Sequence, residues 1–183
     1  MKPEPDKTPQ SLDRRLFVAL RTHCHQRPLE LALVALSQSG NWGFLWIGLA
    51  LIGWIIGLVT GARGGRGLAI IMPSAVWTTL AANYAVKLLV RRERPVSSEP
   101  GLEPLLGVPA STSFPSSHAA MSFAGATVLA YFHPSLWPLY YALAFLVAWT
   151  RVYAGVHYPS DVLAGTAVGL VMGGFWVLFL NWI

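Results

Sequence analysis

Four long stretches of this chain carry no charged side chain, and they constrain the fold more than any other feature. They are residues 31–62, 67–86, 104–150 and 162–183. A helix that crosses a lipid bilayer needs about 20 consecutive apolar residues, and the third stretch is long enough for two such helices. Only 11% of the 183 residues are charged, against about 25% in a soluble domain. The chain is therefore predicted to be an integral membrane protein.

The distribution of apolar residues predicts an all-α, polytopic membrane helical bundle. Five crossings are expected, at residues 42–60, 68–91, 118–132, 139–153 and 159–180. Pro73 is expected to kink the second crossing. In the last crossing, Gly165, Gly169 and Gly173 recur every four residues and predict a smooth face for close packing against another helix.

The N-terminal part of the chain predicts a tail and two short helices. Residues 1–10 are expected to be a disordered tail, and residues 11–183 a single transmembrane domain. The segment SLDRRLFVALRTH has the pattern of a short amphipathic helix, which could lie on the membrane surface or pack on the body of the protein. A second short helix is expected from Pro28 to Gly40. A sixth crossing would result if residues 16–36 span the membrane, although they contain Arg21, His25 and Arg27.

The segment TRVYAGVHYPSD interrupts the apolar second half of the chain. After Glu103 the only charged residues are Arg151 and Asp161, and both lie in this segment with His157 between them. A charge at the bilayer centre costs about 2.5–3.5 kcal/mol or more, so charges kept at the ends of crossings indicate a role. A structural role, as an ion pair between helices or an interfacial anchor, is one possibility. Asp161 follows His157 by four residues and could accept a hydrogen bond that fixes the imidazole tautomer.

Further polar residues lie around the end of the second crossing. Lys87 and Arg94 are about two helical turns apart and would lie on one side if the helix continued to Arg94. The proline after Arg94 disfavours a helix there and predicts an exit into a loop. Arg91 and Arg92 are most simply interpreted as interfacial anchors. Asn83, one turn before Lys87, could line a pocket or bond to another helix.

The segment SFPSSHAA predicts a helix start, with Ser116 or Ser117 as the N-cap and His118 in the first turn. Free N–H groups and the helix dipole at such an end form an anion site. Three cations, this helix start and two histidines are groups suited to phosphoryl transfer, in which one histidine attacks phosphorus and the other protonates the leaving oxygen. No acidic cluster for divalent ions accompanies them, so neither a metal nor another cofactor is expected.

Three segments resemble the signature motifs of the type 2 phosphatidic acid phosphatase superfamily. They are KLLVRRERP at residues 87–95, PSSH at 115–118 and TRVYAGVHYPSD at 150–161, in the family's order and internal spacing. The resemblance implies a helical-bundle core, with His157 as the nucleophile, Asp161 orienting it and His118 as the general acid. It also implies that the phosphate is held by Lys87, Arg94, Ser116, Ser117 and Arg151.

Two residues depart from the family pattern. Ser117 stands where the family usually has glycine, and Thr150 where it usually has serine. A first helical turn does not require a positive φ, so Ser117 should fit, although its Cβ could narrow the approach to the phosphate. Thr150 keeps a hydroxyl group and is expected to have only a supporting role.

Together these features favour a metal-independent membrane phosphatase that hydrolyses a lipid phosphate monoester or diphosphate through a phosphohistidine. Polyprenyl diphosphate and phosphatidylglycerol phosphate are candidate substrates. The alternatives are a non-catalytic protein that binds lipid head groups and a phosphatase of small soluble esters. The expected partners are the lipid substrate and membrane lipids, with no nucleic acid and no obligate protein partner.

The expected location is the cell (inner) membrane, with the site at the membrane interface. With five crossings, the N-terminus and the motif loops share one face. That face would carry an excess of cations, which favours the cytoplasmic side by the positive-inside rule; outside the motifs they are Lys2, Lys7, Arg14, Arg15, Arg21 and Arg27. A crossing by residues 16–36 would turn the site outward instead.

Overall fold

The protein, seen here as a computed structural model, consists of helices and connecting loops in the residues that the structure describes, which are 12–22, 27–61, 65–98 and 103–182. These residues contain no strand, and the prediction of an all-α fold is confirmed for them. The predicted tail at residues 1–10 lies outside the described residues. In chain order the elements are α1 (Leu12–Thr22), α2 (Arg27–Ser39), η1 (Asn41–Gly43), α3 (Phe44–Thr60), α4 (Gly65–Val90), α5 (Pro95–Ser98), α6 (Ser117–Phe132), η2 (Pro134–Leu136), α7 (Trp137–Tyr153) and α8 (Pro159–Trp182).

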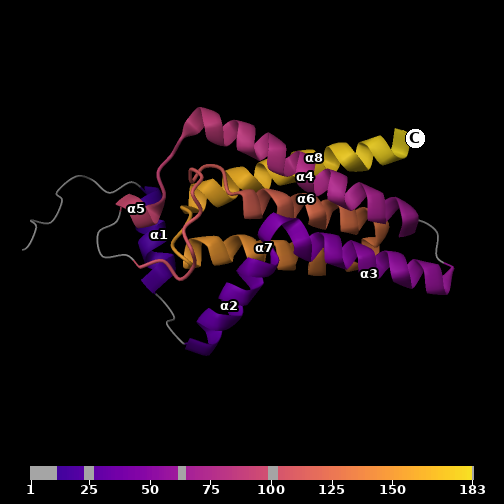
Figure 1. The fold of residues 1–183 in the computed structure, drawn as a ribbon, viewed down its shortest axis with the longest axis horizontal. Helices are drawn as coiled ribbons and strands as arrows, with labels where there is room; N and C mark the ends of the chain where they lie inside the picture. Colours follow the sequence, from indigo (N-terminus) through magenta and orange to yellow (C-terminus); the bar gives the residue numbers. More distant parts are fainter. Residues whose placement is uncertain (1–11, 23–26, 62–64, 99–102, 183) are drawn as a thin grey trace, which may run out of the picture.

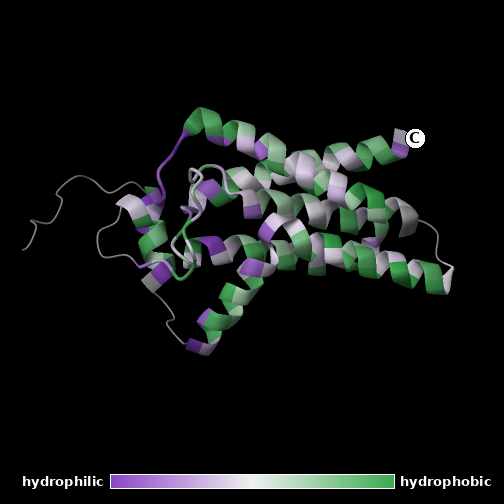
Figure 2. Cartoon of the chain, in the orientation of Figure 1, coloured by the Kyte–Doolittle hydropathy of each residue, from purple (hydrophilic) through white to green (hydrophobic). Residues whose placement is uncertain are grey.

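Five long helices, α3, α4, α6, α7 and α8, run side by side along the long axis of the molecule (Figure 1). They correspond to the five predicted crossings, and their bounds agree with the prediction to within a few residues. Hydrophobic residues predominate along these helices, whereas hydrophilic residues concentrate at the end that carries α1 and α5 (Figure 2). The bundle therefore has an apolar body and one polar end.

Not all five helices have the length of a full bilayer crossing. Among the described residues, three segments are long and apolar enough to span: Asn41–Thr60, Gly67–Ser98 and Pro159–Trp182. Helices α6 and α7 contain 16 and 17 residues, which is about 24–26 Å at 1.5 Å per residue. The hydrocarbon core is about 30 Å thick. The structure therefore supports a membrane bundle, and the count of five crossings stays a prediction.

Helix α6 lies at the centre of the bundle, where it contacts α3, α4, α7 and α8. The glycines of α8 allow an especially close approach. A β-carbon at Gly165 would lie 2.3 Å from the carbonyl oxygen of Ser116, and one at Gly169 would lie 2.3 Å from that of Ala120. At Gly173 it would meet the side chain of Thr127 at 2.7 Å. The predicted close-packing face is confirmed, and it fixes the start of α6 against α8.

Helices α1 and α2 lie at the polar end of the bundle rather than along it (Figure 1). Of residues 16–36, those that the structure describes lie in these two helices, of 11 and 13 residues, each shorter than the roughly 20 residues that a crossing needs; residues 23–26 lie outside the described residues. Helix α1 packs on the body of the protein through Phe17, which is fully buried with its ring 5.5 Å from the ring of Tyr158. Leu12 and Leu16 remain exposed on α1. The prediction that α1 packs on the body of the protein is thus confirmed for the face that carries Phe17.

Helix α4 ends at Val90, and the chain turns there because Arg91 has a positive φ of 48°. The helix does not continue to Arg94, so the predicted exit into a loop before Pro95 is confirmed, and Lys87 and Arg94 do not share a helix face. The turn and the loop after it bring Arg94 back to the bundle instead. Helix α4 runs through Pro73, and the kink expected there stays a prediction.

Candidate active site

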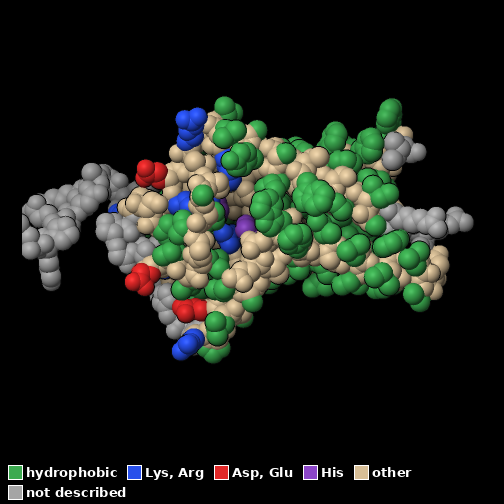
Figure 3. All heavy atoms as spheres, viewed as in Figure 1, with side chains coloured by type: hydrophobic (Ala, Val, Ile, Leu, Met, Phe, Trp, Pro, Cys, Tyr) green, Lys and Arg blue, Asp and Glu red, His purple; other side chains and the backbone are tan. Residues whose placement is uncertain are grey.

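The three motif segments meet at the polar end of the bundle, from the end of α4, the start of α6 and the turn between α7 and α8. In the space-filling view, Lys, Arg and His side chains gather in a hollow at the edge of the apolar surface (Figure 3). Six of the eight predicted site residues are buried: Lys87, Arg94, Ser116, Arg151, His157 and Asp161. Ser117 and His118 are half-buried beside them. Burying this many charged groups together is costly unless they serve a ligand or one another.

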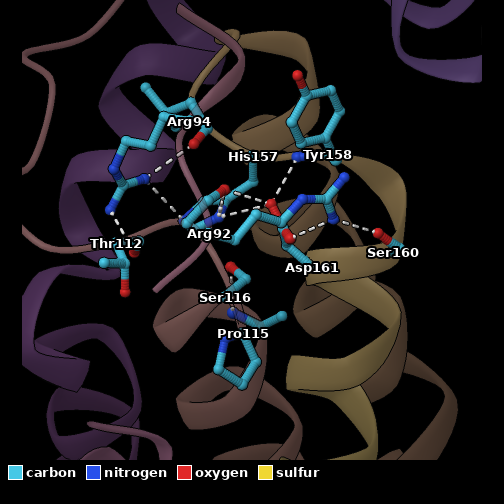
Figure 4. A network of polar contacts seen from close by, with 12 residues as sticks. Arg92, Arg94, Thr112, Pro115, Ser116, His157, Tyr158, Ser160 and Asp161 are labelled. Atoms are coloured by element: carbon cyan, nitrogen blue, oxygen red, sulfur yellow. Dashed lines mark hydrogen bonds and ion pairs between the residues drawn. The ribbon is translucent and has the colours of Figure 1, made fainter. Parts of the chain in front are cut away.

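His157 and Asp161 form the predicted pair across the first turn of α8. The Nδ1 atom of His157 lies 3.5 Å from Oδ2 of Asp161. The same carboxylate oxygen accepts hydrogen bonds from the Ser113 hydroxyl and, at 2.8 Å, from the backbone N–H of Tyr158. The Ser113 oxygen is also 3.4 Å from His157 Nδ1. The carboxylate is therefore held on several sides, with the imidazole against it (Figure 4).

The contacts of His157 fix which nitrogen carries the hydrogen. Its Nε2 atom lies 3.2 Å from Nη1 of Arg94. A guanidinium can only donate, so Nε2 must be the acceptor, and the hydrogen of a neutral ring is on Nδ1, facing Asp161. Burial lowers the pKa of His157 to about 3, although the hydrogen bond to Asp161 opposes this, and the charges of Arg94 and Arg151 lower it further. The free lone pair of Nε2 is thus aimed at a cation.

Carbonyl oxygens of residues 111–113 hold two of the cations. Lys87 Nζ donates to the carbonyl oxygen of Thr112 at 2.6 Å. Arg94 donates through Nε to the carbonyl oxygen of Ser111 and through Nη1 to that of Val156, at 2.9 and 2.8 Å. Burial lowers the pKa of Arg94 to about 10, and the charge of Asp161 opposes that effect. Both side chains are therefore positioned by backbone acceptors, and neither forms an ion pair with an acidic side chain among the residues that the structure describes.

The start of α6 is fixed by its neighbours as the sequence predicts. Ser116 is the N-cap, its hydroxyl accepting from the N–H of Ala119, and its own N–H donates to the Asp161 carbonyl oxygen at 2.9 Å. Asn83, fully buried in α4, donates to the carbonyl oxygen of Pro115 and to the Ser117 hydroxyl. Asn83 thus bonds to another helix, which was one of its two expected roles. Thr150 donates only within α7, to the carbonyl oxygen of Val147.

His118 faces a cavity of about 390 Å³, here called the His118 cavity. Its lining includes Gln38, Asn41, Ser117, His118, Met121 and Arg151. The Nε2 atom of His118 lies 3.0 Å from Oδ1 of Asn41, and Nη1 of Arg151 donates to the Ser37 hydroxyl at 2.5 Å. The Nε atom of Arg151 is buried and has no partner among the described residues. The side chains of His118, on α6, and Arg151, on α7, therefore both line the His118 cavity. The N–H at Nε of Arg151 is still available to donate a hydrogen bond to a ligand.

A second hollow opens onto the apolar side of α4. This α4 groove has a volume of about 720 Å³ and is lined by Trp42, Trp77, Leu80, Tyr84, Lys87 and Pro109, among others. It shares Trp42, Leu80, Pro109 and Ser117 with the His118 cavity. The two hollows therefore adjoin, and the α4 groove leads from the apolar flank of the bundle to the buried cations.

The expectation that Arg92 is an interfacial anchor is wrong. Its guanidinium donates to Oδ1 of Asp161 at 2.8 Å and to Oδ2 of Asp13 at 2.6 Å. It also donates to the Ser160 hydroxyl and lies over the Tyr158 ring (Figure 4). Arg92 thus links α1 to the carboxylate beside His157. No spacing in the sequence indicates this contact, because the turn at Arg91 decides where Arg92 points.

Ser113 is a second residue that the motifs did not single out, and its contacts predict a measurable effect. In Ser113→Ala, Asp161 loses a hydrogen bond, and bonds to charged groups are worth about 1.5–3 kcal/mol. We expect kcat to fall roughly 10-fold or more while KM changes little, because the hydroxyl orients the carboxylate and does not contact substrate. Steady-state kinetics with p-nitrophenyl phosphate would measure this. Wild-type kcat in Ser113→Ala would show that the remaining bonds to Asp161 suffice.

Within the described residues, no group of three or more His, Cys, Asp or Glu side chains is arranged to hold a metal ion. The ligands available for an anion are instead cations, backbone N–H groups and hydroxyls. Such a donor set suits a phosphate group.

Known proteins resemble this chain over most of its length. The sequence pattern of the PAP2 superfamily matches residues 68–183. The decaprenylphosphoryl-5-phosphoribose phosphatase of Mycobacterium tuberculosis is 33% identical over 159 residues, which are 86% of this chain and 85% of that protein. The putative undecaprenyl-diphosphatase YbjG of Escherichia coli is 34% identical over 125 residues, 67% of this chain and 60% of that protein.

Solved structures share the fold. A transmembrane PAP2 type phosphatidylglycerolphosphate phosphatase from Bacillus subtilis superposes with a TM-score of 0.76 and 25% identity, covering 95% of this chain and 87% of that one. LpxE of Aquifex aeolicus superposes with a TM-score of 0.74 and 24% identity, covering 90% and 93%. The second likeness shows the common fold alone.

Proposed function

This chain belongs to the PAP2 superfamily, and we propose that its buried cations and histidines hydrolyse a lipid phosphate through a phosphohistidine. The protein is a membrane lipid phosphatase by that membership. Polyprenyl diphosphate, phosphatidylglycerol phosphate and similar lipids are the candidate substrates. The likeness to phosphatases favours this function over a non-catalytic protein that binds head groups, and the apolar α4 groove favours a lipid over a small soluble ester.

The observation that carries the proposal is the orientation of His157. Its Nε2 lone pair faces Nη1 of Arg94 at 3.2 Å, while its Nδ1–H faces Asp161. A phosphate held by Arg94 would place its phosphorus within reach of Nε2. The nitrogen then bonds to phosphorus, and the bond from phosphorus to the leaving oxygen breaks with its electron pair on that oxygen. Asp161 stabilises the positive charge that develops on the ring.

The charge of the phosphoryl group is balanced by groups that the fold already holds in place. Lys87, Arg94 and Arg151 supply positive charge, and Ser116 and Ser117 at the start of α6 add the N-terminal end of a helix dipole. Because these groups are buried, their attraction to the phosphoryl oxygens is stronger than it would be in water. They need little rearrangement, since backbone carbonyl oxygens and neighbouring side chains already fix them.

His118 is the proposed proton donor. A bound phosphate dianion favours the doubly protonated ring, which gives a proton to the leaving oxygen. In the second half of the reaction, His118 takes a proton from water as the water oxygen attacks phosphorus. The bond from phosphorus to His157 breaks, and inorganic phosphate is released. No step in this scheme needs a metal ion.

A panel of lipid phosphates tests the proposed function. Purified protein should release inorganic phosphate from at least one of phosphatidylglycerol phosphate, polyprenyl diphosphate and phosphatidic acid. Because cations of the protein itself balance the charge, we expect the rate to be the same with and without EDTA. Strong inhibition by EDTA, reversed by adding a divalent metal, would contradict the metal-independent scheme. Release from none of the lipids would contradict the function.

We also propose that residues 11–183 act as one domain that crosses the membrane five times, with the active site on the cytoplasmic face. Packing of α1 at the polar end supports a shared face for the N-terminal cations and the motif loops. In the predicted five-crossing arrangement, six N-terminal cations, Arg91 and Arg92 would lie on the cytoplasmic face, against Arg63 and Arg66 in the sequence between the first two crossings.

The sidedness has a direct test. Ser97 is exposed at the polar end, so Ser97→Cys in a Cys24→Ser background gives one reporter thiol. In intact cells, an impermeant maleimide should leave this thiol unlabelled until the membrane is opened. A reporter cysteine at Arg63 should show the reverse pattern. Labelling of Ser97→Cys in intact cells would instead place the site outside.

A further inference from the structure

Asn41 is in contact with the proposed proton donor. Its Oδ1 atom lies 3.0 Å from Nε2 of His118. An amide oxygen only accepts, so Nε2 carries the hydrogen in this contact. The leaving oxygen must later accept a proton from the same nitrogen, at a similar distance. Asn41 Oδ1 therefore occupies the position that the leaving oxygen would take, so the Asn41 side chain has to turn aside when substrate binds and would then lie beside the first atoms of the leaving group.

The backbone fixes Asn41 at this place. The corner between α2 and α3 contains two residues with left-handed conformations, Trp42 with φ of 54° and Gly43 with φ of 76°. A β-carbon at Gly43 would lie 2.2 Å from Cγ1 of Val76, so only glycine fits there. At Gly40, on the other side of Asn41, a β-carbon would lie 3.2 Å from Cδ2 of His118. The corner thus lies directly against the histidine ring.

The His118 cavity beyond this point is lined mostly by apolar residues, with a few polar side chains among them and little charge. Among the described residues that line it, Arg151 is the one lysine or arginine, and the function proposed above uses it for the transferred phosphate. The other side chains there that can form hydrogen bonds are those of Gln38, Asn41, Trp42, Ser117 and His118. A second phosphate bonded directly to the reacting one, as in a diphosphate, would bring further negative charge into this space, whereas the phosphodiester of phosphatidylglycerol phosphate is separated from the reacting phosphate by the glycerol. Binding a second phosphate here calls for further cations, which this lining does not offer.

Amide side chains suit a different kind of leaving group. Gln38 and Asn41 each offer a donor and an acceptor, as a hydroxyl group does. The adjoining α4 groove is lined by Trp42, Trp77, Leu80 and other apolar residues, and Trp77 and Leu80 lie on α4 itself. A leaving group could therefore place a polar head in the cavity and extend an apolar chain into the groove.

We propose that the His118 cavity binds an uncharged, hydroxyl-bearing head group, and that Asn41 and Gln38 select for it. This inference rests on the proposed function. The substrate class is then a lipid whose terminal phosphate is a monoester of a glycerol or sugar head group. A polyprenyl diphosphate, whose leaving group is itself a phosphate, is a poorer substrate, and so is phosphatidic acid, whose phosphate is bonded directly to diacylglycerol.

The test compares three substrates at matched detergent concentration: phosphatidylglycerol phosphate, a polyprenyl diphosphate and phosphatidic acid. The quantity measured is the ratio of kcat/KM for phosphatidylglycerol phosphate to that for each of the others. We expect both ratios to be roughly 10 or more, and to fall about 5-fold or more in Asn41→Leu, since a hydrogen bond contributes about 0.5–1.5 kcal/mol. Gln38→Leu should also lower both kcat/KM ratios. Because Gln38 is exposed on α2, its replacement leaves the packing intact.

Ser39→Ala is the matched control. Ser39 is the next residue on α2, and among the described residues its hydroxyl donates only to the carbonyl oxygen of Leu36, so both ratios should stay at the wild-type value. A wild-type preference for the diphosphate or for phosphatidic acid would overturn the inference while the phosphatase function stands. Ratios that neither Asn41→Leu nor Gln38→Leu changes would overturn it as well. Phosphate release from none of the three lipids would overturn the phosphatase function and this inference with it.

Discussion

His157→Ala is expected to have no phosphatase activity on any substrate, because no phosphoenzyme can form without the attacking nitrogen. His118→Ala is expected to respond to the leaving group instead. A general acid contributes about 10²- to 10⁴-fold when the leaving group needs a proton, as a lipid alcohol does. A p-nitrophenolate leaves without one. His118→Ala should therefore lose most activity on a lipid monoester and much less on p-nitrophenyl phosphate.

Asp161→Asn serves as an internal control for the comparison of the two histidine variants. Asp161→Asn should fall between the two histidine variants, because an imidazole that is poorly oriented still attacks occasionally. The measurement is kcat/KM on the lipid and on p-nitrophenyl phosphate for each variant. If both histidine variants lose the same factor on both substrates, the assignment of nucleophile and acid is wrong.

Arg151→Lys is expected to be nearly as inactive as Arg151→Ala, with a loss of about 10²-fold or more in kcat, the range seen when one oxyanion donor is removed. The side chain is buried, and its Nε atom has no partner among the described residues while Nη1 bonds to Ser37. A planar guanidinium can bind two phosphoryl oxygens at once, and an ammonium group cannot do so in the same geometry.

The control for Arg151 is Arg15→Lys, which makes the same chemical change on the exposed surface of α1. It should retain wild-type kcat and KM. If Arg151→Lys retained near-normal turnover while Arg151→Ala did not, charge alone would be the requirement at this position.

The sequence was sufficient to predict the parts of the fold that depend on the local pattern of residues. Long apolar runs set the five long helices, and the glycines at 165, 169 and 173 predicted the close contact of α8 with α6 that the structure contains. The N-cap at Ser116 follows from local chemistry in the same way. The motif spacing indicated His118, His157 and their cations, because each motif is a short segment whose geometry its own residues decide.

The parts that could not be predicted depend on contacts between distant segments. Arg92 looks like an anchor in the sequence, yet the turn at Arg91 directs it to Asp13 and Asp161. Ser113 lies outside the matched motif segments, and only the folded loop brings its hydroxyl to Asp161. Asn41 lies in an apolar run with no nearby signal, and it meets His118 because two left-handed residues bend the chain after it.

The central claim is that His157 becomes phosphorylated during turnover. Rapid quenching without acid, after mixing the protein with ³²P-labelled substrate, should trap a phosphoprotein that is stable to base and labile to acid, and peptide mapping should place the phosphate on His157. His118→Ala with an activated ester should still form this adduct. A labelled adduct in His157→Ala, or a label that maps to another residue in the wild type, would contradict the claim.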